Sequence, residues 1–385
     1  MASLIRDLAA STPQMLAVFD DDALVRAALR FEAELAAAAA AEGLLAAEDA
    51  DAIAAACVAE VDIPALAVAA AHAGTLAIPL VGLLRERTAC IRPAAAAAVH
   101  LGATSQDLAD TALILQAKAG CSLLKVDLDR LMAALAHLAV THATTPMLGR
   151  TLLQAARAIT FGLAVSNWLL GLAAAAARLQ READAALLVQ LGGAVGTHDA
   201  LGGKGRAVTV RLAERLELGT PITPWHARRD GMAALASALA ILTGVVGKLA
   251  FDIALLGQSE VAEVFEPYQP GRGGSSVMAH KRNPTGCQIA RSAALRAPQL
   301  AATVVAGLPQ ELQRGLGGWQ AEAPVLAELF ALTHGALAAM ALVAEGLEVH
   351  PERMAENLAA ADVHGDVGEA AELTMRALET WLAGR

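Results

Sequence analysis

The stretch from Gly271 to Pro284 combines glycines, serines and basic side chains, which suits the handling of an anion and a proton. Glycines let a loop move and let backbone N–H groups approach a bound anion. Lys281 and its basic neighbours add donors and positive charge. The hydroxyl of Ser275 is a poor base in water, so proton transfer would need nearby cations and dipoles that stabilise its alkoxide. A solvated glycine turn before a helix that begins near Pro284 is an equally open interpretation.

A second polar segment runs from His100 to Asp107 and precedes a long apolar repeat. It contains an imidazole, the hydroxyls of Thr104 and Ser105, an amide and a carboxylate. Unpaired N–H groups at a helix start favour anions, so the segment could bind a substrate carboxylate. For this segment alone, an ordinary helix cap with a hydrogen-bonded histidine is the commoner arrangement.

Two further segments offer groups that bind carboxylates. Arg150 and Gln154 are four residues apart and would share one face if a helix has begun there. Arginine can hold a carboxylate through two parallel hydrogen bonds. His226 and Arg229 lie in Pro-Trp-His-Ala-Arg-Arg-Asp, a basic turn expected to open a long helix. A surface ion pair for Arg150 and plain packing for His226 are the commoner alternatives.

The elements that must position these groups are predicted to be helices. Apolar residues recur from Leu108 to Leu138 in steps of three and four, which predicts one long helix capped by Thr104 and Ser105. The apolar stretch 161–191 ends at a glycine pair, which predicts a helix stop, and the stretch 232–264 repeats the pattern. Alternating β-branched and polar residues are nearly absent, so few strands are expected.

Composition and charge argue against several classes of protein. The 385 residues are 56% hydrophobic but only 3% aromatic, which favours helices packed through small side chains. The formal charge of −10 repels nucleic acid. The four cysteines form no C-x-x-C pair, which argues against a zinc site and fits a reducing cytoplasm. No export signal is recognised, and the apolar segment 231–247 is expected to be a buried helix rather than a membrane span.

Together and in order, these segments resemble the fumarase/aspartase superfamily. Its loop signature G-S-S-x-M-x-x-K-x-N is matched from Gly274 to Asn283, with Ala279 in place of the usual proline. The resemblance covers roughly residues 15 to 325 and includes Phe31-Glu32, Gly149-Arg-Thr, Gln190-Leu-Gly-Gly and Trp319-Gln-Ala-Glu. It implies an all-α fold with a central bundle of long helices, and a homotetramer in which three subunits build each active site.

We expect a helical N-terminal domain over 1–98, a long-helix bundle with the signature loop over 99–345, and a short C-terminal helical remnant over 346–385. About 100 residues follow Pro284, so the C-terminal region is shorter than in most members of the superfamily.

Within the superfamily, the chain most resembles bacterial 3-carboxy-cis,cis-muconate cycloisomerases. Three stretches support that resemblance: Gly-Ala-Thr-Ser-Gln-Asp, Pro-Trp-His-x-x-Arg-Asp and Trp-Gln-Ala-Glu. Adenylosuccinate lyases are the near alternative. They carry a catalytic histidine at the position of Leu152, and a leucine side chain cannot transfer a proton. Another β-elimination lyase and a helical scaffold without catalysis remain as further alternatives.

The resemblance implies a cytoplasmic enzyme of aromatic degradation that needs no metal or other cofactor. One carboxylate of a conjugated tricarboxylate would add to an alkene carbon and give a carboxymuconolactone. Ser275 is expected to carry the proton, while Lys281 and Asn283 hold the loop and support developing charge. The residues expected to bind the substrate are His100, Thr104, Ser105, Arg150, Gln154, Ser276, Met278, His226 and Arg229.

Overall fold

The computed structural model describes residues 4–274, 277–278, 281–363 and 365–384. The elements before residue 161 are α1 (Leu4–Leu8), α2 (Pro13–Val18), α3 (Asp21–Ala41), α4 (Ala47–Val58), α5 (Ile63–Ala73), α6 (Ala77–Ile91), the 3-10 helix η1 (Pro93–Ala98), α7 (Ser105–Thr141), β1 (Pro146–Thr151) and β2 (Gln154–Thr160). The later elements are α8 (Phe161–Ala186), η2 (Asp199–Leu201), α9 (Gly205–Leu216), α10 (Asp230–Leu256), β3 (Val264–Phe265), α11 (Thr285–Ala306), η3 (Trp319–Ala321), α12 (Glu322–Glu345), β4 (Glu348–Val349), α13 (Pro351–Ala360) and α14 (Ala370–Ala383).

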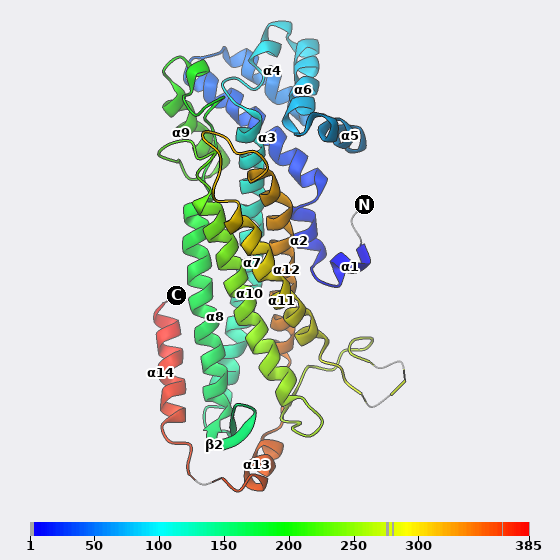
Figure 1. The fold of residues 1–385 in the computed structure, drawn as a ribbon, viewed down its shortest axis with the longest axis vertical. Coiled ribbons are helices and arrows are strands. Elements are labelled where there is room, and N and C mark those ends of the chain that lie inside the picture. Colours follow the sequence, from blue (N-terminus) through cyan, green and yellow to red (C-terminus); the bar gives the residue numbers. More distant parts are fainter. Residues whose placement is uncertain (1–3, 275–276, 279–280, 364, 385) are drawn as a thin grey trace.

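Long helices α7, α8, α10, α11 and α12 pack side by side in an elongated bundle (Figure 1). The longest, α7, has 37 residues and spans about 55 Å at 1.5 Å per residue. Leucine, alanine and valine side chains fill the core between these helices. This arrangement confirms the expected all-α fold around a bundle of long helices.

The ends of these helices follow local chemistry. Thr104 caps α7 as predicted, in a capping box with Asp107. The prediction that α8 continues to Leu191 is wrong, because the chain leaves the helix after Ala186 and Leu188 forms a β-bridge with Gly219. Likewise, α10 ends at Leu256, well before the predicted stop.

The N-terminal helices pack at one end of the bundle, where α3, α4 and α6 share a smaller apolar core with α9 (Figure 1). Phe31 of α3 and Leu212 of α9 are both fully buried in this core. Segments far apart in the sequence therefore meet at the end of the bundle where α7 begins.

The described strands are few and short, as predicted. β1 and β2 form an antiparallel hairpin in which Thr151 pairs with Gln154 and Arg150 with Ala155. The idea that Arg150 and Gln154 share a helical face is therefore wrong. Leu152 and Leu153 form the turn with φ of 53° and 63°, the backbone of a two-residue hairpin loop of type I′.

The C-terminal segment returns along the bundle. α13 packs against β1, and α14 lies along α8 (Figure 1).

Among the described residues, three helical segments are long and apolar enough to cross a membrane by length and composition alone, namely Phe161–Ala186, Asp230–Leu256 and Trp319–Glu345, with α4 and α5 as a bent fourth possibility. Between 44% and 67% of each apolar window is buried inside the protein.

Candidate functional site

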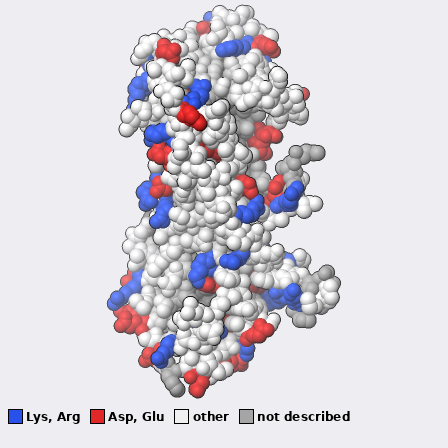
Figure 2. Space-filling view, viewed as in Figure 1, with Lys and Arg blue, Asp and Glu red and all other residues white. Residues whose placement is uncertain are grey.

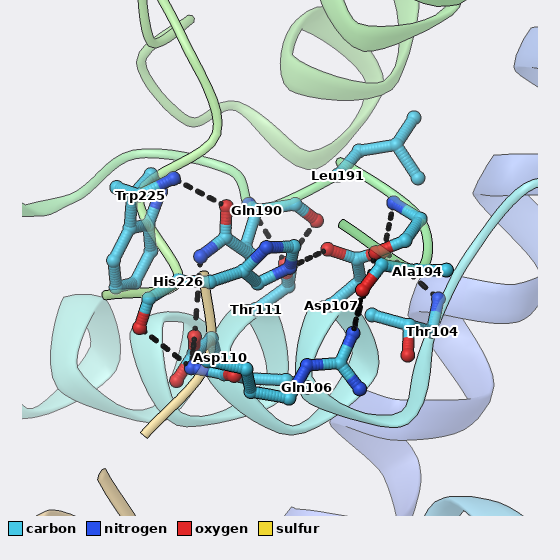
Figure 3. A network of polar contacts seen from close by, with 12 residues as sticks. Thr104, Gln106, Asp107, Asp110, Thr111, Gln190, Leu191, Ala194, Trp225 and His226 are labelled. Carbon is cyan, nitrogen blue, oxygen red and sulfur yellow. Dashed lines mark hydrogen bonds and ion pairs between the residues drawn. The ribbon is translucent and has the colours of Figure 1, made fainter. Parts of the chain in front are cut away.

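The first turn of α7 is tied to two distant parts of the chain through Asp107 (Figure 3). Its Oδ2 accepts hydrogen bonds from the backbone N–H groups of Thr104 at 2.9 Å and Gly193 at 3.0 Å. Its Oδ1 lies 2.6 Å from Nε2 of His226, which is also buried. Both oxygens of this buried carboxylate are therefore satisfied, as a buried charge requires.

A buried ion-pair cluster lies next to this carboxylate. Arg229 is 1% exposed and donates to Asp110 at 2.8 and 3.0 Å and to Glu322 at 3.0 and 3.1 Å. Burial disfavours the charge of Arg229, but the two carboxylates raise its pKa above the ordinary value. For Glu322, burial raises the pKa, and the hydrogen bond from Arg229 offsets this rise only in part. The cluster joins α7, α10 and α12.

Two amide side chains complete this network. Gln106 donates to the carbonyl oxygen of His226 at 2.9 Å and to Asp110 at 3.2 Å. Gln190 donates to Asp110 at 3.2 Å, and its Oε1 accepts from the backbone N–H of Trp225 at 2.9 Å. The network fixes the backbone around Thr104 and Ser105, which are both half-buried.

His100 lies just before α7, in a left-handed backbone conformation with φ of 68°. Its Nδ1 is 2.5 Å from Oε1 of Glu32, a side chain of α3 that is fully buried. His100 is therefore held at the same end of the bundle as Thr104 and Ser105.

Arg150 lies at the other end of the bundle, in the β1–β2 hairpin. Its guanidinium binds Glu263 through two hydrogen bonds of 3.0 and 2.8 Å. Asn357 of α13 donates to the same carboxylate at 2.8 Å. Gln154, after the turn, is exposed. The arginine thus forms an ion pair with a carboxylate of this chain, which is the alternative that the sequence left open for it.

The signature loop lies between β3 and α11. Gly273 accepts a hydrogen bond from the backbone N–H of Asn283 at 2.8 Å, and the side chain of Asn283 donates to Gly274 at 3.3 Å. Lys281 donates through its backbone to Met278 at 3.1 Å, and both side chains are exposed. Ser275 and Ser276, the predicted proton carrier and its neighbour, lie outside the described residues.

The base of the loop is anchored by acidic side chains. Glu266 accepts hydrogen bonds from the N–H groups of Gly286 and Cys287, at 3.0 and 2.8 Å, in the first turn of α11. Arg282 binds Glu348 at 2.9 and 2.7 Å. A cavity of about 200 Å³ at this base is lined by Lys281 and Asn283 among others. Loop glycines and basic groups therefore border a space open to a small ligand.

The predicted site residues fall into groups that lie far apart along the bundle. His100, Thr104, Ser105, His226 and Arg229 gather around the start of α7. Arg150 and Gln154 lie in the hairpin at the opposite end, and Met278, Lys281 and Asn283 belong to the loop before α11, which projects from the side of the bundle (Figure 1). One chain does not bring these groups together. In the described part of the chain, no three His, Cys, Asp or Glu side chains are grouped so that they could hold a metal ion.

Sequence reasoning gave no role to Asp110, Glu263 or Glu266, which hold Arg229, Arg150 and the start of α11. Asp110 follows Asp107 by three residues in a predicted helix, and this spacing could have marked both as neighbours on one face. Glu263 and Glu266 lie in an irregular segment, where spacing gives no such signal.

The sequence of this chain matches a family of known proteins. A family model described as lyase matches residues 7–298. The chain belongs to this lyase family. The expected membership of the fumarase/aspartase superfamily is thereby confirmed, and the protein is an enzyme of that superfamily that acts on a small molecule.

Similar relatives include two bacterial enzymes named 3-carboxy-cis,cis-muconate cycloisomerase. One, from Bradyrhizobium diazoefficiens, is 48% identical over 356 residues, which cover 92% of this chain and 78% of the relative. The other, from Pseudomonas putida, is 44% identical over 359 residues, covering 93% and 85%. The crystal structure of the 3-carboxy-cis,cis-muconate lactonizing enzyme from Pseudomonas putida matches with a TM-score of 0.89 and 41% identity, covering 99% of this chain and 88% of that one. The predicted resemblance to these cycloisomerases is confirmed.

Proposed function

We propose that the protein is a 3-carboxy-cis,cis-muconate cycloisomerase. The observation that supports this most directly is its 48% identity to an enzyme of that name over 92% of its length. The loop signature from Gly274 to Asn283 is present in the same chain. Leu152 supports the choice against adenylosuccinate lyase, because a leucine at that position of the β1–β2 turn cannot transfer a proton.

In the proposed reaction, one carboxylate oxygen attacks an alkene carbon and the neighbouring carbon takes up a proton. Negative charge accumulates on a second carboxylate in an enediolate-like species, so preorganised N–H donors and cations should lower the barrier most. Ser275 would give the proton to carbon, and Lys281 would stabilise the resulting negative charge. Asn283 would hold the loop through its bonds to Gly273 and Gly274.

Roles in substrate binding are proposed from the two ends of the bundle. His100, Thr104 and Ser105 would meet a substrate carboxylate at the start of α7, where helix N–H groups favour anions. His226 and Arg229 would act from behind this surface, since both are buried and bound to carboxylates of this chain. Arg150, Gln154, Ser276 and Met278 would contribute from the hairpin and the loop.

The separation of these groups supports a homotetramer with shared sites. Helix α7 is about 55 Å long and separates its own start from the hairpin, so one chain alone does not supply a complete site and several subunits would contribute. Exposed apolar side chains on the bundle, such as Ile241, Phe251 and Leu342, offer surface for such contacts. Figure 2 shows that much of the middle of the bundle is uncharged on the face drawn. We infer a soluble, cytoplasmic protein, in keeping with such an assembly.

The test is ultraviolet absorbance of the purified protein with 3-carboxy-cis,cis-muconate, with adenylosuccinate in a parallel cuvette. Rapid loss of the conjugated-diene band would support the cycloisomerase. Cleavage of adenylosuccinate without loss of that band would overturn the interpretation of Leu152. Unchanged absorbance in both cuvettes would contradict the proposed function. Size-exclusion chromatography with light scattering would test the tetramer separately.

A further inference from the structure

The carboxylate of Glu32 lowers the stability of the fold at its position on α3. It is fully buried, and its neighbours Leu29, Phe31 and Leu35 belong to the apolar core. One oxygen, Oε1, faces His100 at 2.5 Å, while Oε2 accepts no hydrogen bond from any described residue. Burying a carboxylate that is only half satisfied destabilises a fold. An apolar residue would serve the packing better, so the function of Glu32 lies in what it does to His100.

His100 is held on its other side by the backbone. It has φ of 68°, and its carbonyl oxygen accepts from the N–H of Ala103 at 3.2 Å in the tight turn before α7. A left-handed conformation is unfavourable for a residue with a Cβ and persists where the surroundings impose it. The ring is 12% exposed, so part of it still reaches the surface beside Thr104 and Ser105. The turn and Glu32 together determine the direction of the imidazole.

The contact also determines which ring nitrogen holds the proton. A carboxylate only accepts hydrogen bonds, so Nδ1 of His100 must carry the hydrogen. Nε2 is then the atom that remains for a ligand, because it makes no hydrogen bond with the described part of the chain. Burial raises the pKa of the nearby thiol of Cys57 to about 12, and the charge of Glu32 contributes to this rise. The thiol is therefore neutral, and His100 is the protonatable base in hydrogen-bond contact with Glu32.

We infer that Glu32 is a positioning residue that holds the imidazole of His100 through its Nδ1–H, so that Nε2 faces the site and, on a doubly protonated ring, donates to a carboxylate of the substrate. This inference rests on the proposed function for the identity of the substrate. Chemically, a positive ring next to a trianion forms a charge-assisted hydrogen bond, which is stronger than a neutral one.

The first test replaces Glu32 by glutamine, which keeps the size and the hydrogen-bond acceptor but removes the charge. We expect KM for 3-carboxy-cis,cis-muconate to rise about 10- to 100-fold, with a smaller change in kcat. This rise corresponds to the loss of one hydrogen bond to a charged group. Glu34→Gln is the matched control on the same helix, because Glu34 pairs with Arg215 at the surface. It should leave KM unchanged. An unchanged KM in Glu32→Gln would overturn the inference.

A double-mutant cycle separates positioning from a general structural role. His100→Gln should raise KM at least as much as Glu32→Gln, and the double variant should match His100→Gln alone. If the two effects multiply, Glu32 acts independently of His100 and the inference fails. Denaturation midpoints and oligomer size of each variant show whether its fold is intact.

A measurement without substrate keeps this inference separate from the proposed function. In the wild-type protein with 15N-labelled histidine, His100 should give the signature of a proton on Nδ1, assigned by its absence in His100→Gln. A proton on Nε2 alone would overturn the inference, even with full activity. If the wild type does not turn over the muconate, the proposed function fails, while the tautomer still shows whether Glu32 positions His100.

Discussion

At the start of α7, Asp107 and Asp110 are buried, and each carboxylate accepts hydrogen bonds from several distant segments. In the loop between β3 and α11, Lys281 and Met278 are exposed, and Arg282 ties the described part of the loop to Glu348 of β4. The first region is rigid before any ligand arrives. The second presents exposed side chains and is joined to the fold at its base by Glu266 and Arg282. Buried anchoring groups and exposed loop groups are therefore built separately in this fold.

The sharpest way to test this division is to remove the proton carrier from the loop. Ser275→Ala should lower kcat by about 10²- to 10⁴-fold, the usual contribution of a positioned acid or base. The melting temperature and the oligomer size should not change, because the loop adds little to the core. Absorbance kinetics measure kcat, calorimetry measures the melting temperature, and size-exclusion chromatography with light scattering measures the oligomer size.

The matched control is Ser122→Ala, since Ser122 lies on the exposed face of α7 and donates only to the carbonyl of Lys118. Its kcat should equal that of the wild type. A kcat near the wild-type value in Ser275→Ala would remove this serine from the chemistry.

The rigid end should respond in the opposite way, with a large loss of stability. Arg229→Met leaves Asp110 and Glu322 buried without their cation, and breaking such a cluster costs about 3–5 kcal/mol. Arg228→Met, one residue earlier, removes an exposed pair with Asp230 and should change the free energy of unfolding by under about 1 kcal/mol. Urea denaturation gives both values. Equal losses in the two variants would contradict the rigid character of this end.

The two ends also differ in how far sequence could predict them. The cap at Thr104 and the length of α7 follow from local residue types and apolar spacing, so both could be predicted. The partners of Arg229 come from α7 and α12, and such long-range pairing leaves no periodic signal. The spacing of Arg150 and Gln154 suits a helix, but the segment folds as a hairpin because Pro146–Thr151 pairs with Gln154–Thr160. Spacing alone does not reveal that pairing.

A smaller effect is expected at the glycine that closes the loop. Gly273 has φ of 70°, and a Cβ there would lie 2.5 Å from the carbonyl oxygen of Asn283. Gly273→Ala should strain the loop by about 1–3 kcal/mol, and kcat/KM should fall about tenfold. Gly274→Ala is the control, because no heavy atom of the described residues beyond its chain neighbours lies within 4 Å of the position that its methyl group would take, and its φ is not in the left-handed region. Equal kinetics for the two variants would show that the backbone conformation of Gly273 does not matter for activity.

The smallest effect is expected where an exposed ion pair ties the loop to β4. The hydrogen bond from Arg282 lowers the pKa of Glu348 below its ordinary value, so the folded state favours the ionised form. The stabilisation is present above the unfolded pKa and is lost as pH falls through the lowered folded pKa. Because both side chains are more than a third exposed, Glu348→Gln should cost less than about 1 kcal/mol at pH 7. Urea denaturation of wild type and variant should then converge in acid, and a difference that persists below the lowered pKa would show that Glu348 stabilises the loop by packing rather than by charge.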